Sequence, residues 1–181
     1  MQSDEILLRA RRLDVSALAQ IHDRFYPEVF RYVRYRLDDE RACEDIASEV
    51  FLRLLDALHK RRGPNQNLRG WLLGTASNLV NDHLRHRYQH VVEELREDEE
   101  DFFGQVHPES TLVDSWEVSQ VRQALMQLTS EQQHVLALRF ADEHSLEETA
   151  AIMEKSVNAV KALQFRAIAS LRRIFEEQFQ A

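Results

Sequence analysis

Apolar residues recur every three or four positions along most of this chain, and few residues interrupt that spacing. The first such stripe consists of Leu18, Ile21, Phe25, Val29, Val33 and Leu37. This spacing places side chains on one face of an α-helix. The 181 residues include only 4 Gly and 3 Pro, so helix breakers are rare. We therefore predict an all-α fold. Pro27 interrupts the first stripe, where it is expected to kink the helix or mark its start.

The composition supports folded domains in a reducing compartment. Hydrophobic residues make up 44% of the chain, enough for one or two small cores. The single cysteine, Cys43, cannot form an internal disulfide or a thiolate zinc site. The first residues lack the apolar core of a signal peptide, and no apolar run approaches membrane-spanning length. We expect a cytoplasmic protein without membrane insertion.

The negative charge is confined to one segment. The chain has a formal net charge of −8, and residues 91–115 alone hold nine acidic residues and one basic residue. This segment also contains Gly104 and Pro108, which are typical of a linker. We predict two small helical domains, residues 1–90 and 116–181, joined by an acidic linker over residues 91–115. The adjacent Phe102 and Phe103 suggest that the linker docks on a partner.

The N-terminal domain combines two further helical stretches. One carries the stripe Ile46, Val50, Leu54 and Leu58. After the loop "HKRRGPNQN", the other stretch is "LRGWLLGTASNLVNDHLRHRYQ", which mixes amides, hydroxyls and arginines. Amides and hydroxyls can bond exposed base edges, while arginines neutralise phosphates. On composition alone, Trp71 is better explained as a core aromatic and Asn78 as a solvent-facing amide.

Three histidines near the end of this stretch, His83, His86 and His90, share a helical face. That spacing could hold a metal ion, but no acidic or thiolate partner is apparent beside it. A surface or phosphate-facing role explains them better. We expect no metal and no cofactor.

The C-terminal domain carries the signals of a helix-turn-helix. Ser145 and Glu148 form a capping box that opens a short helix, which is expected to end near Met153. Ser156 is a suitable cap for the longer helix that follows. Two helices joined by so short a turn are typical of DNA-binding modules. A plain two-helix packing unit with a solvated basic face remains the alternative.

Helical geometry sorts the last helix into two faces. The inner face is predicted to hold Val160, Leu163, Ala167, Leu171 and Ile174. The outer face is predicted to hold Asn158, Lys161, Ala162, Phe165, Ala169, Arg172 and Arg173. Cations, small side chains and one exposed aromatic suit a helix that approaches a DNA groove.

Three blocks together resemble a known family. "EDIASEVFLRLL", "LRGWLLGTASNLVNDHLRHR" and "SLEETAAIMEKSVNAVKALQFRAIASLRR" occur in this order, and the similarity runs from about Leu13 to Ile174. They closely resemble bacterial RNA polymerase sigma factors of the sigma-70 family, extracytoplasmic-function (ECF) group. The resemblance implies a transcription initiation factor that directs core RNA polymerase to promoters.

The resemblance also assigns roles to residues. Region 2 would contact the β′ clamp helices of polymerase through Asp45, Ser48, Glu49 and Arg53. It would read the −10 element through Leu68, Thr75, Ser77, Asn78, Asn81, Arg85 and Arg87. Region 4 would contact the β flap and read the −35 element through Asn158, Lys161, Ala162, Phe165, Arg166, Arg172 and Arg173. An anti-sigma factor is a further expected partner.

Three positions depart from the family pattern. Ser48 stands where Gln is usual, Glu154 stands where the turn usually has Gly, and Ala162–Leu163 replaces a common Ser-Arg pair.

The resemblance further implies a linker that runs through the polymerase cleft. Its acids would mimic nascent RNA there, and in the free chain they could mask the basic helices.

Other functions fit less well. The sequence contains no P-loop, no G-x-S-x-G and no H-E-x-x-H motif, so an enzyme is not expected. A stand-alone helix-turn-helix regulator with a helical sensor domain is the main alternative. A protein-binding helical adaptor is another, and in it Arg172 and Arg173 would be dispensable.

Overall fold

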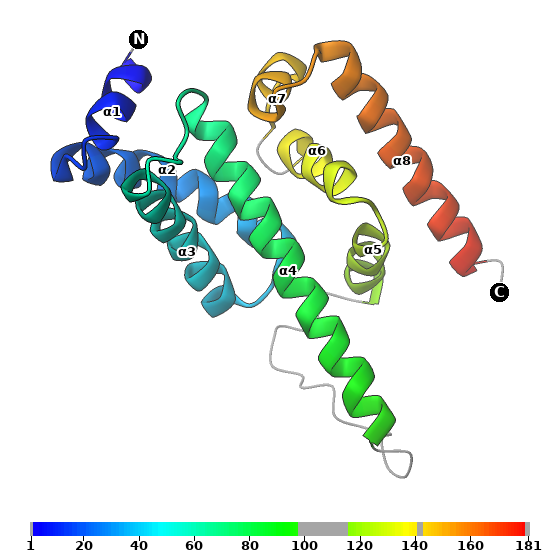
Figure 1. The fold of residues 1–181 in the computed structure, drawn as a ribbon. Coiled ribbons are helices and arrows are strands. Elements are labelled where there is room, and N and C mark those ends of the chain that lie inside the picture. Colours follow the sequence, from blue (N-terminus) through cyan, green and yellow to red (C-terminus); the bar gives the residue numbers. More distant parts are fainter. Residues whose placement is uncertain (1, 98–115, 141–142, 180–181) are drawn as a thin grey trace.

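The computed structural model describes residues 2–97, 116–140 and 143–179 (Figure 1). Within these ranges the chain forms eight α-helices and no strand, which confirms the predicted all-α fold. The acidic run over 98–115, with Phe102 and Phe103, lies outside the described residues. The helices group into an N-terminal bundle, α1 to α4, and a C-terminal bundle, α5 to α8.

The N-terminal bundle consists of α1 (Gln2–Ala10), α2 (Val15–Arg36), α3 (Glu40–His59) and α4 (Leu68–Glu97). Asp14 caps α2 by accepting from the backbone N–H of Ala17, 3.1 Å away. Asp39 caps α3 in the same way. Each carboxylate satisfies donors that the first helical turn leaves free. The sequence therefore sets both helix starts.

The predicted apolar stripes form the core of this bundle. Ile21, Phe25, Val29, Val33 and Leu37 are all buried. The stripe of α3 is buried as well, and Leu72, Leu73, Ala76 and Val80 complete the core from α4. Burying each large aliphatic side chain contributes about 1.5–3 kcal/mol relative to leaving it exposed. Packing along the stripes thus determines how these helices meet.

Two helix bounds bear on the sequence expectations. Pro27 lies inside α2, which runs from Val15 to Arg36, so of the two expected alternatives a helix start at Pro27 is excluded. Helix α4 continues to Glu97 and so covers the first residues of the segment predicted as linker. Glu, Arg and Leu over 93–97 are good helix formers, and a helix already begun extends at little cost.

The C-terminal bundle consists of α5 (Trp116–Met126), α6 (Ser130–Phe140), α7 (Leu146–Met153) and α8 (Val157–Phe179). The predicted capping box is confirmed, since Ser145 and Glu148 each bond the other's backbone N–H. Ser156 accepts from the N–H of Ala159 at 3.2 Å and caps α8. The helix-turn-helix therefore forms as α7, a short turn and α8.

Glu154 is the C-cap residue of α7 and lies in that turn. Its φ of 53° lies in the left-handed region, where family members usually have glycine and where an L side chain is strained. Its N–H still closes α7 by bonding the carbonyl groups of Ala150 and Ala151. The turn between α7 and α8 therefore forms with Glu154 in the left-handed conformation.

The two bundles touch. Three apolar side chains of the C-terminal bundle, Ala137, Leu138 and Ile152, belong to the same buried cluster as the N-terminal core. Helix α4 lies beside α6 and α7 (Figure 1). Sequence reasoning predicted two tethered domains and did not predict this contact.

The capping box makes a first prediction. Replacing Ser145 with Ala leaves the N–H of Glu148 without its side-chain acceptor, and we expect a loss of about 1 kcal/mol. Chemical denaturation followed by circular dichroism measures it. Glu147→Ala on the same turn, whose side chain is exposed, is the control and should cost less than half as much. Equal losses in both variants would contradict the role of the cap.

Candidate nucleic-acid interface

The outer face of α8 is fully available to a ligand. All seven residues predicted to read or hold the −35 element are exposed, and Phe165 is 75% exposed. Of the five residues predicted for the inner face, Val160, Leu163, Ala167 and Ile174 are buried against α5, α6 and α7, and Leu171 is partly buried. The helix therefore presents cations, an amide and an aromatic ring on one side of a rigid support.

The basic side chains on this face of α8 make few and weak contacts within the described part of the protein. Arg173 lies 4.0 Å from Glu177, and both side chains are largely exposed. Such surface pairs contribute little and are readily exchanged for another anion. Within the ranges that the structure describes, Arg166 donates only to the carbonyl of Ala162 on its own helix, at 3.4 Å. Lys161 and Arg172 make no ion pair within the described part of the chain, so they remain open to phosphate oxygens.

The residues of α4 that were predicted to read the −10 element differ in how exposed their side chains are. Asn78 and Arg85 are exposed, but Leu68 is 5% exposed and lies in the core. Thr75 donates to the carbonyl of Trp71 at 2.8 Å within its own helix. Arg87 lies on α4, but its side chain is outside the described residues. In this conformation Leu68 supports the helix, whereas Asn78 presents its amide outward.

Ser77 and Asn81 meet an arginine that the sequence analysis did not single out. Arg36, at the end of α2, lies 3.4 Å from the Ser77 hydroxyl and donates to the side-chain oxygen of Asn81. The same guanidinium donates to the side-chain oxygen of Gln133 on α6. The amide nitrogen of Asn81 is buried and has no hydrogen-bond partner among the described residues. No sequence signal marks Arg36, because only the fold brings it to α4.

The loop before α4 contacts the turn of the helix-turn-helix. Asn67 donates to the carbonyl groups of Ala151, at 2.9 Å, and Ile152, at 3.3 Å. It also lies 3.2 Å from a carboxylate oxygen of Glu154. A groove of about 930 Å³ follows this contact and is lined from both bundles, including Trp71, which is partly buried.

Glu28 on α2 makes a second polar contact between the two bundles. Glu28 accepts from Arg69 at 2.6 Å and lies 3.5 Å from the buried His144, which precedes α7. The Glu28 side chain is mostly shielded from solvent. A shielded carboxylate needs such donors, because burying its charge alone would be costly.

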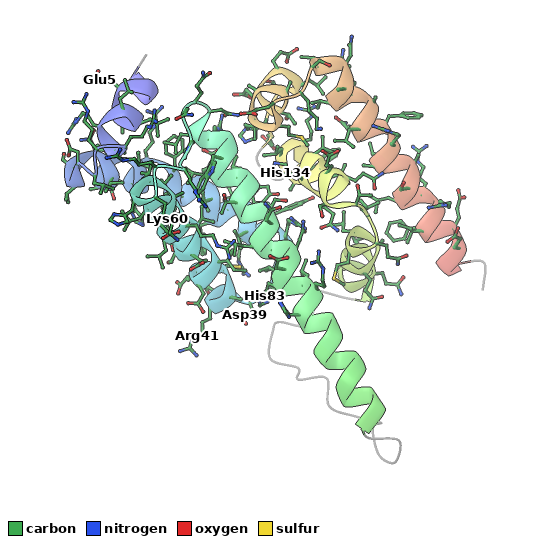
Figure 2. The ribbon with its side chains drawn as sticks, in the orientation of Figure 1. Glu5, Asp39, Arg41, Lys60, His83 and His134 are labelled. Carbon is green, nitrogen blue, oxygen red and sulfur yellow. The ribbon has the colours of Figure 1, made fainter. Side chains whose placement is uncertain are left out.

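His134 on α6 faces the N-terminal bundle (Figure 2). Its Nδ1 lies 2.7 Å from the hydroxyl of Tyr32, whose ring is fully buried. Burial, aided by the nearby Arg36 guanidinium and opposed by Glu131, lowers the pKa of His134 from 6.5 to about 4. The imidazole is therefore neutral at pH 7 and can share a hydrogen bond with Tyr32.

The outward face of α3 carries the four residues predicted to contact polymerase. Asp45 and Ser48 are exposed, and Glu49 pairs with Arg53 at 3.0 Å. Two large apolar side chains lie on the same helix, Leu52 at 60% and Leu55 at 44% exposure. Exposed apolar groups among charges are typical of protein-binding surfaces. The sequence analysis named the charged residues but missed these leucines.

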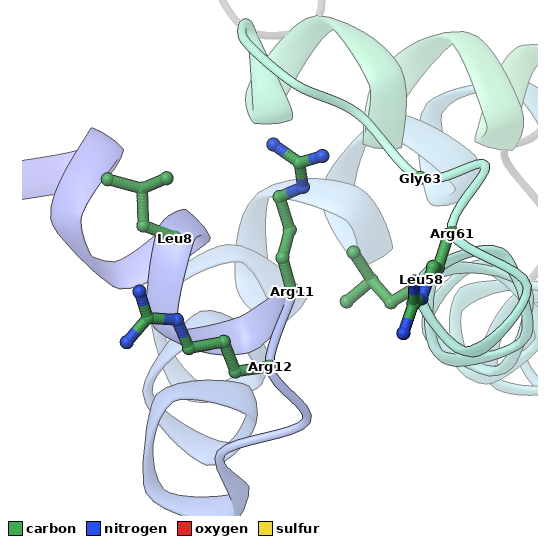
Figure 3. Close-up of a pocket in the computed structure, with 6 residues that line it drawn as sticks. All are labelled: Leu8, Arg11, Arg12, Leu58, Arg61 and Gly63. Atoms are coloured by element: carbon green, nitrogen blue, oxygen red, sulfur yellow. The ribbon is translucent and has the colours of Figure 1, made fainter.

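A separate pocket of about 390 Å³ opens between the end of α1 and the end of α3 (Figure 3). Its lining includes Leu8, Leu58 and three arginines: Arg11, Arg12 and Arg61. The arginine side chains project in different directions around it. The exposed arginines do not converge on one point, so the pocket does not define a site by itself.

Among the described residues, a metal site would need clustered ligands and a membrane span would need a long apolar helix. No group of three His, Cys, Asp or Glu side chains there could hold a metal ion. His83 and His86 lie on α4, while the side chain of His90 is outside the described residues. No helix in the described part of the chain is both long and apolar enough to cross a bilayer.

Known families match both bundles. The sequence model of sigma-70 region 2 matches residues 21–89, and that of sigma-70 region 4 matches residues 124–173. Together the two regions cover about two thirds of the chain. Region 2 thus falls on the N-terminal bundle and region 4 on the C-terminal bundle.

Individual relatives agree with this match. The ECF RNA polymerase sigma factor BldN of Streptomyces coelicolor is 31% identical over 176 residues, with 96% of this chain and 66% of BldN covered. The ECF RNA polymerase sigma factor SigX of Bacillus subtilis is 28% identical, with 86% of this chain and 82% of SigX covered. The structure of CnrH in complex with the cytosolic domain of CnrY shares the fold, with a TM-score of 0.60 and 20% identity over 96% of this chain and 97% of that one.

Two sigma-70 regions in this order define the class of protein. The chain belongs to the sigma-70 family of RNA polymerase sigma factors, and within it to the ECF group. It is therefore a transcription initiation factor and not an enzyme.

The lowered pKa of His134 predicts that the stability of the folded chain depends on pH. Its pKa is lower in the folded chain than in the unfolded chain, so the unfolded chain takes up a proton first as the pH falls below 6.5. Between pH 7.5 and 5.5 we expect a loss of about 1 kcal/mol in stability. Thermal unfolding measured across that range tests this.

His134→Gln is the matched variant, because its amide does not titrate. We expect its stability to change little between pH 7.5 and 5.5. The carboxyl groups of Asp14 and Glu148, whose pKa values are lowered by hydrogen bonds, titrate below this range. An equal loss in His134→Gln would assign the pH dependence to other groups.

Proposed function

We propose that the N-terminal bundle reads and opens the −10 element while α8 reads the −35 element, with both held on core RNA polymerase. The observation that carries this proposal is the outer face of α8, where Lys161, Phe165 and Arg172 are all exposed on a helix-turn-helix. Two weak DNA sites fixed on one polymerase reinforce each other through effective concentration.

On α8 the residues divide by chemistry. Lys161, Arg166, Arg172 and Arg173 suit phosphate oxygens, which position the helix without reading sequence. Asn158 suits a base edge, and Ala162 allows close approach of the backbone. Phe165 is the exposed apolar group that suits a thymine methyl. The Ala162–Leu163 departure removes polar groups here, and Leu163 is buried instead.

On α4 the exposed Asn78 is the central candidate for capturing a base outside the stack. An amide can both donate to and accept from a base edge. Ser77, Asn81 and Thr75 would join it once their present bonds are exchanged. Arg85 and Arg87 would hold the backbone, and Arg85 is free to do so because its contact with Asp82 spans 3.5 Å at the surface.

Polymerase would bind the outward face of α3. Leu52 and Leu55 supply apolar area beside Asp45, Glu49 and Arg53. An apolar centre with a charged rim is the usual anatomy of such an interface. Ser48, where Gln is usual, leaves this surface with a shorter polar group.

A regulatory protein is a further proposed partner. The relative CnrH was solved in complex with the cytosolic domain of CnrY. We place this chain in the cytoplasm, with polymerase, and propose that an anti-sigma factor holds it there.

The β flap would be the polymerase partner of the C-terminal bundle.

The direct test is run-off transcription with purified core polymerase and a genomic promoter library. We expect discrete start sites that appear only when the chain is added. A chain that binds DNA alone and leaves core polymerase unselective would instead be a stand-alone regulator.

Asn78→Ala tests the −10 assignment. We expect open-complex formation, measured by permanganate reactivity at promoters found in the run-off assay, to fall by roughly 5- to 150-fold, because one good base contact contributes about 1–3 kcal/mol. Affinity for core polymerase should stay the same. Gln20→Ala, an exposed amide on α2, is the control. Equal losses in promoter opening and polymerase binding would count against a base contact.

Arg172→Ala tests the phosphate contacts of α8. We expect the logarithm of holoenzyme–promoter affinity to depend less steeply on the logarithm of salt concentration, by about one unit of slope. Lys60→Ala, an exposed lysine that pairs with Asp56, should leave the slope unchanged. An unchanged slope in Arg172→Ala would remove this residue from the interface.

A further inference from the structure

Arg36, in the last turn of α2, reaches across to the helix that is proposed to read the −10 element. Its guanidinium lies 3.4 Å from the Ser77 hydroxyl and donates to the side-chain oxygen of Asn81, both on α4. It also donates to the side-chain oxygen of Gln133 on α6. The three hydrogen bonds that Arg36 makes within the described part of the chain therefore all leave its own helix, and two of them run to proposed −10 residues.

Stabilising the end of α2 does not explain this placement. A basic side chain in the last turn of a helix commonly interacts with the negative end of the helix dipole. Arg34 is placed for that role, since it is exposed and donates to the backbone carbonyl of Asp38 just beyond the helix. Arg36 bonds side chains of two other helices instead, so its position is explained by what lies on those helices.

The charge of Arg36 is not neutralised by a carboxylate within the ranges that the structure describes. Its three acceptors belong to a hydroxyl and two amides, which are all uncharged. Other arginines of the same bundle, such as Arg53 and Arg69, pair with a glutamate. Arg36 is partly buried, and a cation removed from water without an anion is costly. Such an arginine is suited to an anion that another molecule supplies.

The unmatched charge of Arg36 acts on its surroundings. Burial first, and then the Arg36 guanidinium, lower the pKa of the nearby His134, while Glu131 opposes them. Because His134 is neutral at pH 7, it adds no competing cation. An anion that approaches this end of α2 is therefore attracted mainly by Arg36 itself.

We propose that Arg36 is a further promoter-binding residue, whose guanidinium binds the backbone phosphate of the nucleotide that Ser77 and Asn81 read. This inference rests on the proposed −10 function of those two residues. When a base takes the hydroxyl and the amide, the guanidinium exchanges two neutral acceptors for a charged one. Arginine suits this role, because its planar fork matches phosphate oxygens and its hydrogen bonds to a charged acceptor are stronger than those to neutral acceptors.

A phosphate fits Arg36 better than a base edge does. A base edge offers uncharged acceptors, which the guanidinium already has in Ser77, Asn81 and Gln133. Only a phosphate neutralises its charge. The buried amide nitrogen of Asn81, which has no partner among the described residues, is a donor that a base acceptor can satisfy. The base and the phosphate of one nucleotide would thus satisfy adjacent groups.

Arg36→Gln is the test variant, because Gln keeps an N–H donor for Asn81 and removes the charge. Promoters found by run-off transcription are prepared with an uncharged methylphosphonate at one −10 phosphate at a time. At one phosphate we expect the methylphosphonate to lower wild-type promoter opening, measured by permanganate reactivity, by roughly tenfold, because hydrogen bonds between charged groups are among the strongest. The same methylphosphonate should have little effect on opening by Arg36→Gln.

Two further arginine variants are matched controls. Arg34→Gln, in the same helical turn, should keep the wild-type sensitivity at that phosphate. Arg36→Lys keeps the charge but not the fork, so it should keep part of the sensitivity. Circular dichroism checks that all three variants keep their helical content, and their affinity for core polymerase should equal that of wild type.

The outcomes separate this inference from the proposed function. Wild-type opening that no methylphosphonate lowers, or equal sensitivity in wild type and Arg36→Gln, would overturn the inference and leave promoter-specific transcription intact. A uniform loss of opening by Arg36→Gln on all templates, with its phosphate sensitivity unchanged, would also overturn it, because Arg36 would then have a structural role only. Failure of the wild-type chain to produce discrete start sites would instead reject the proposed function, and this inference with it.

Discussion

The apolar seam of each long helix determines which side chains this protein can offer to DNA and to polymerase. On α8, burial of Val160, Leu163 and Ala167 leaves no rotational freedom, so Lys161 and Phe165 must face outward. On α3, the buried stripe from Ile46 to Leu58 likewise turns Asp45 and Leu52 to the surface. Function here depends on rigid helices whose inner faces are fixed by packing.

Polar groups on α4 have one set of partners in this structure and a second set in the proposed promoter complex. Here the guanidinium of Arg36 contacts the side chains of Ser77 and Asn81, and it also donates to the side-chain oxygen of Gln133. In the proposed complex the same hydroxyl and amide would face bases. Because one set of bonds would replace the other, the net cost of the exchange is smaller than the number of broken contacts suggests. A neutral His134 suits its position near Arg36, since protonation would place a second cation there.

Local signals in the sequence predicted local structure well. The capping box at Ser145, the end of α7 at Met153 and the inner face of α8 all follow from side chains within a few residues of one another. The sequence also showed Glu154 where the family usually has Gly. It did not show that this residue adopts a positive φ. The burial of Leu68 and the contacts of Arg36 were not predictable, because Leu68 is buried only where the helices pack and Arg36 lies 41 to 97 positions from its partners.

The central claim is that one chain carries two promoter-reading modules that act together on core RNA polymerase. Footprinting of the holoenzyme on a promoter found by run-off transcription measures directly whether both modules lie on the DNA at once. We expect protection over both the −35 and the −10 elements, and the protection over the −35 element should be lost when the outer face of α8 is neutralised. Protection that is unchanged by that neutralisation, in a holoenzyme to which the chain is shown to bind, would contradict the claim.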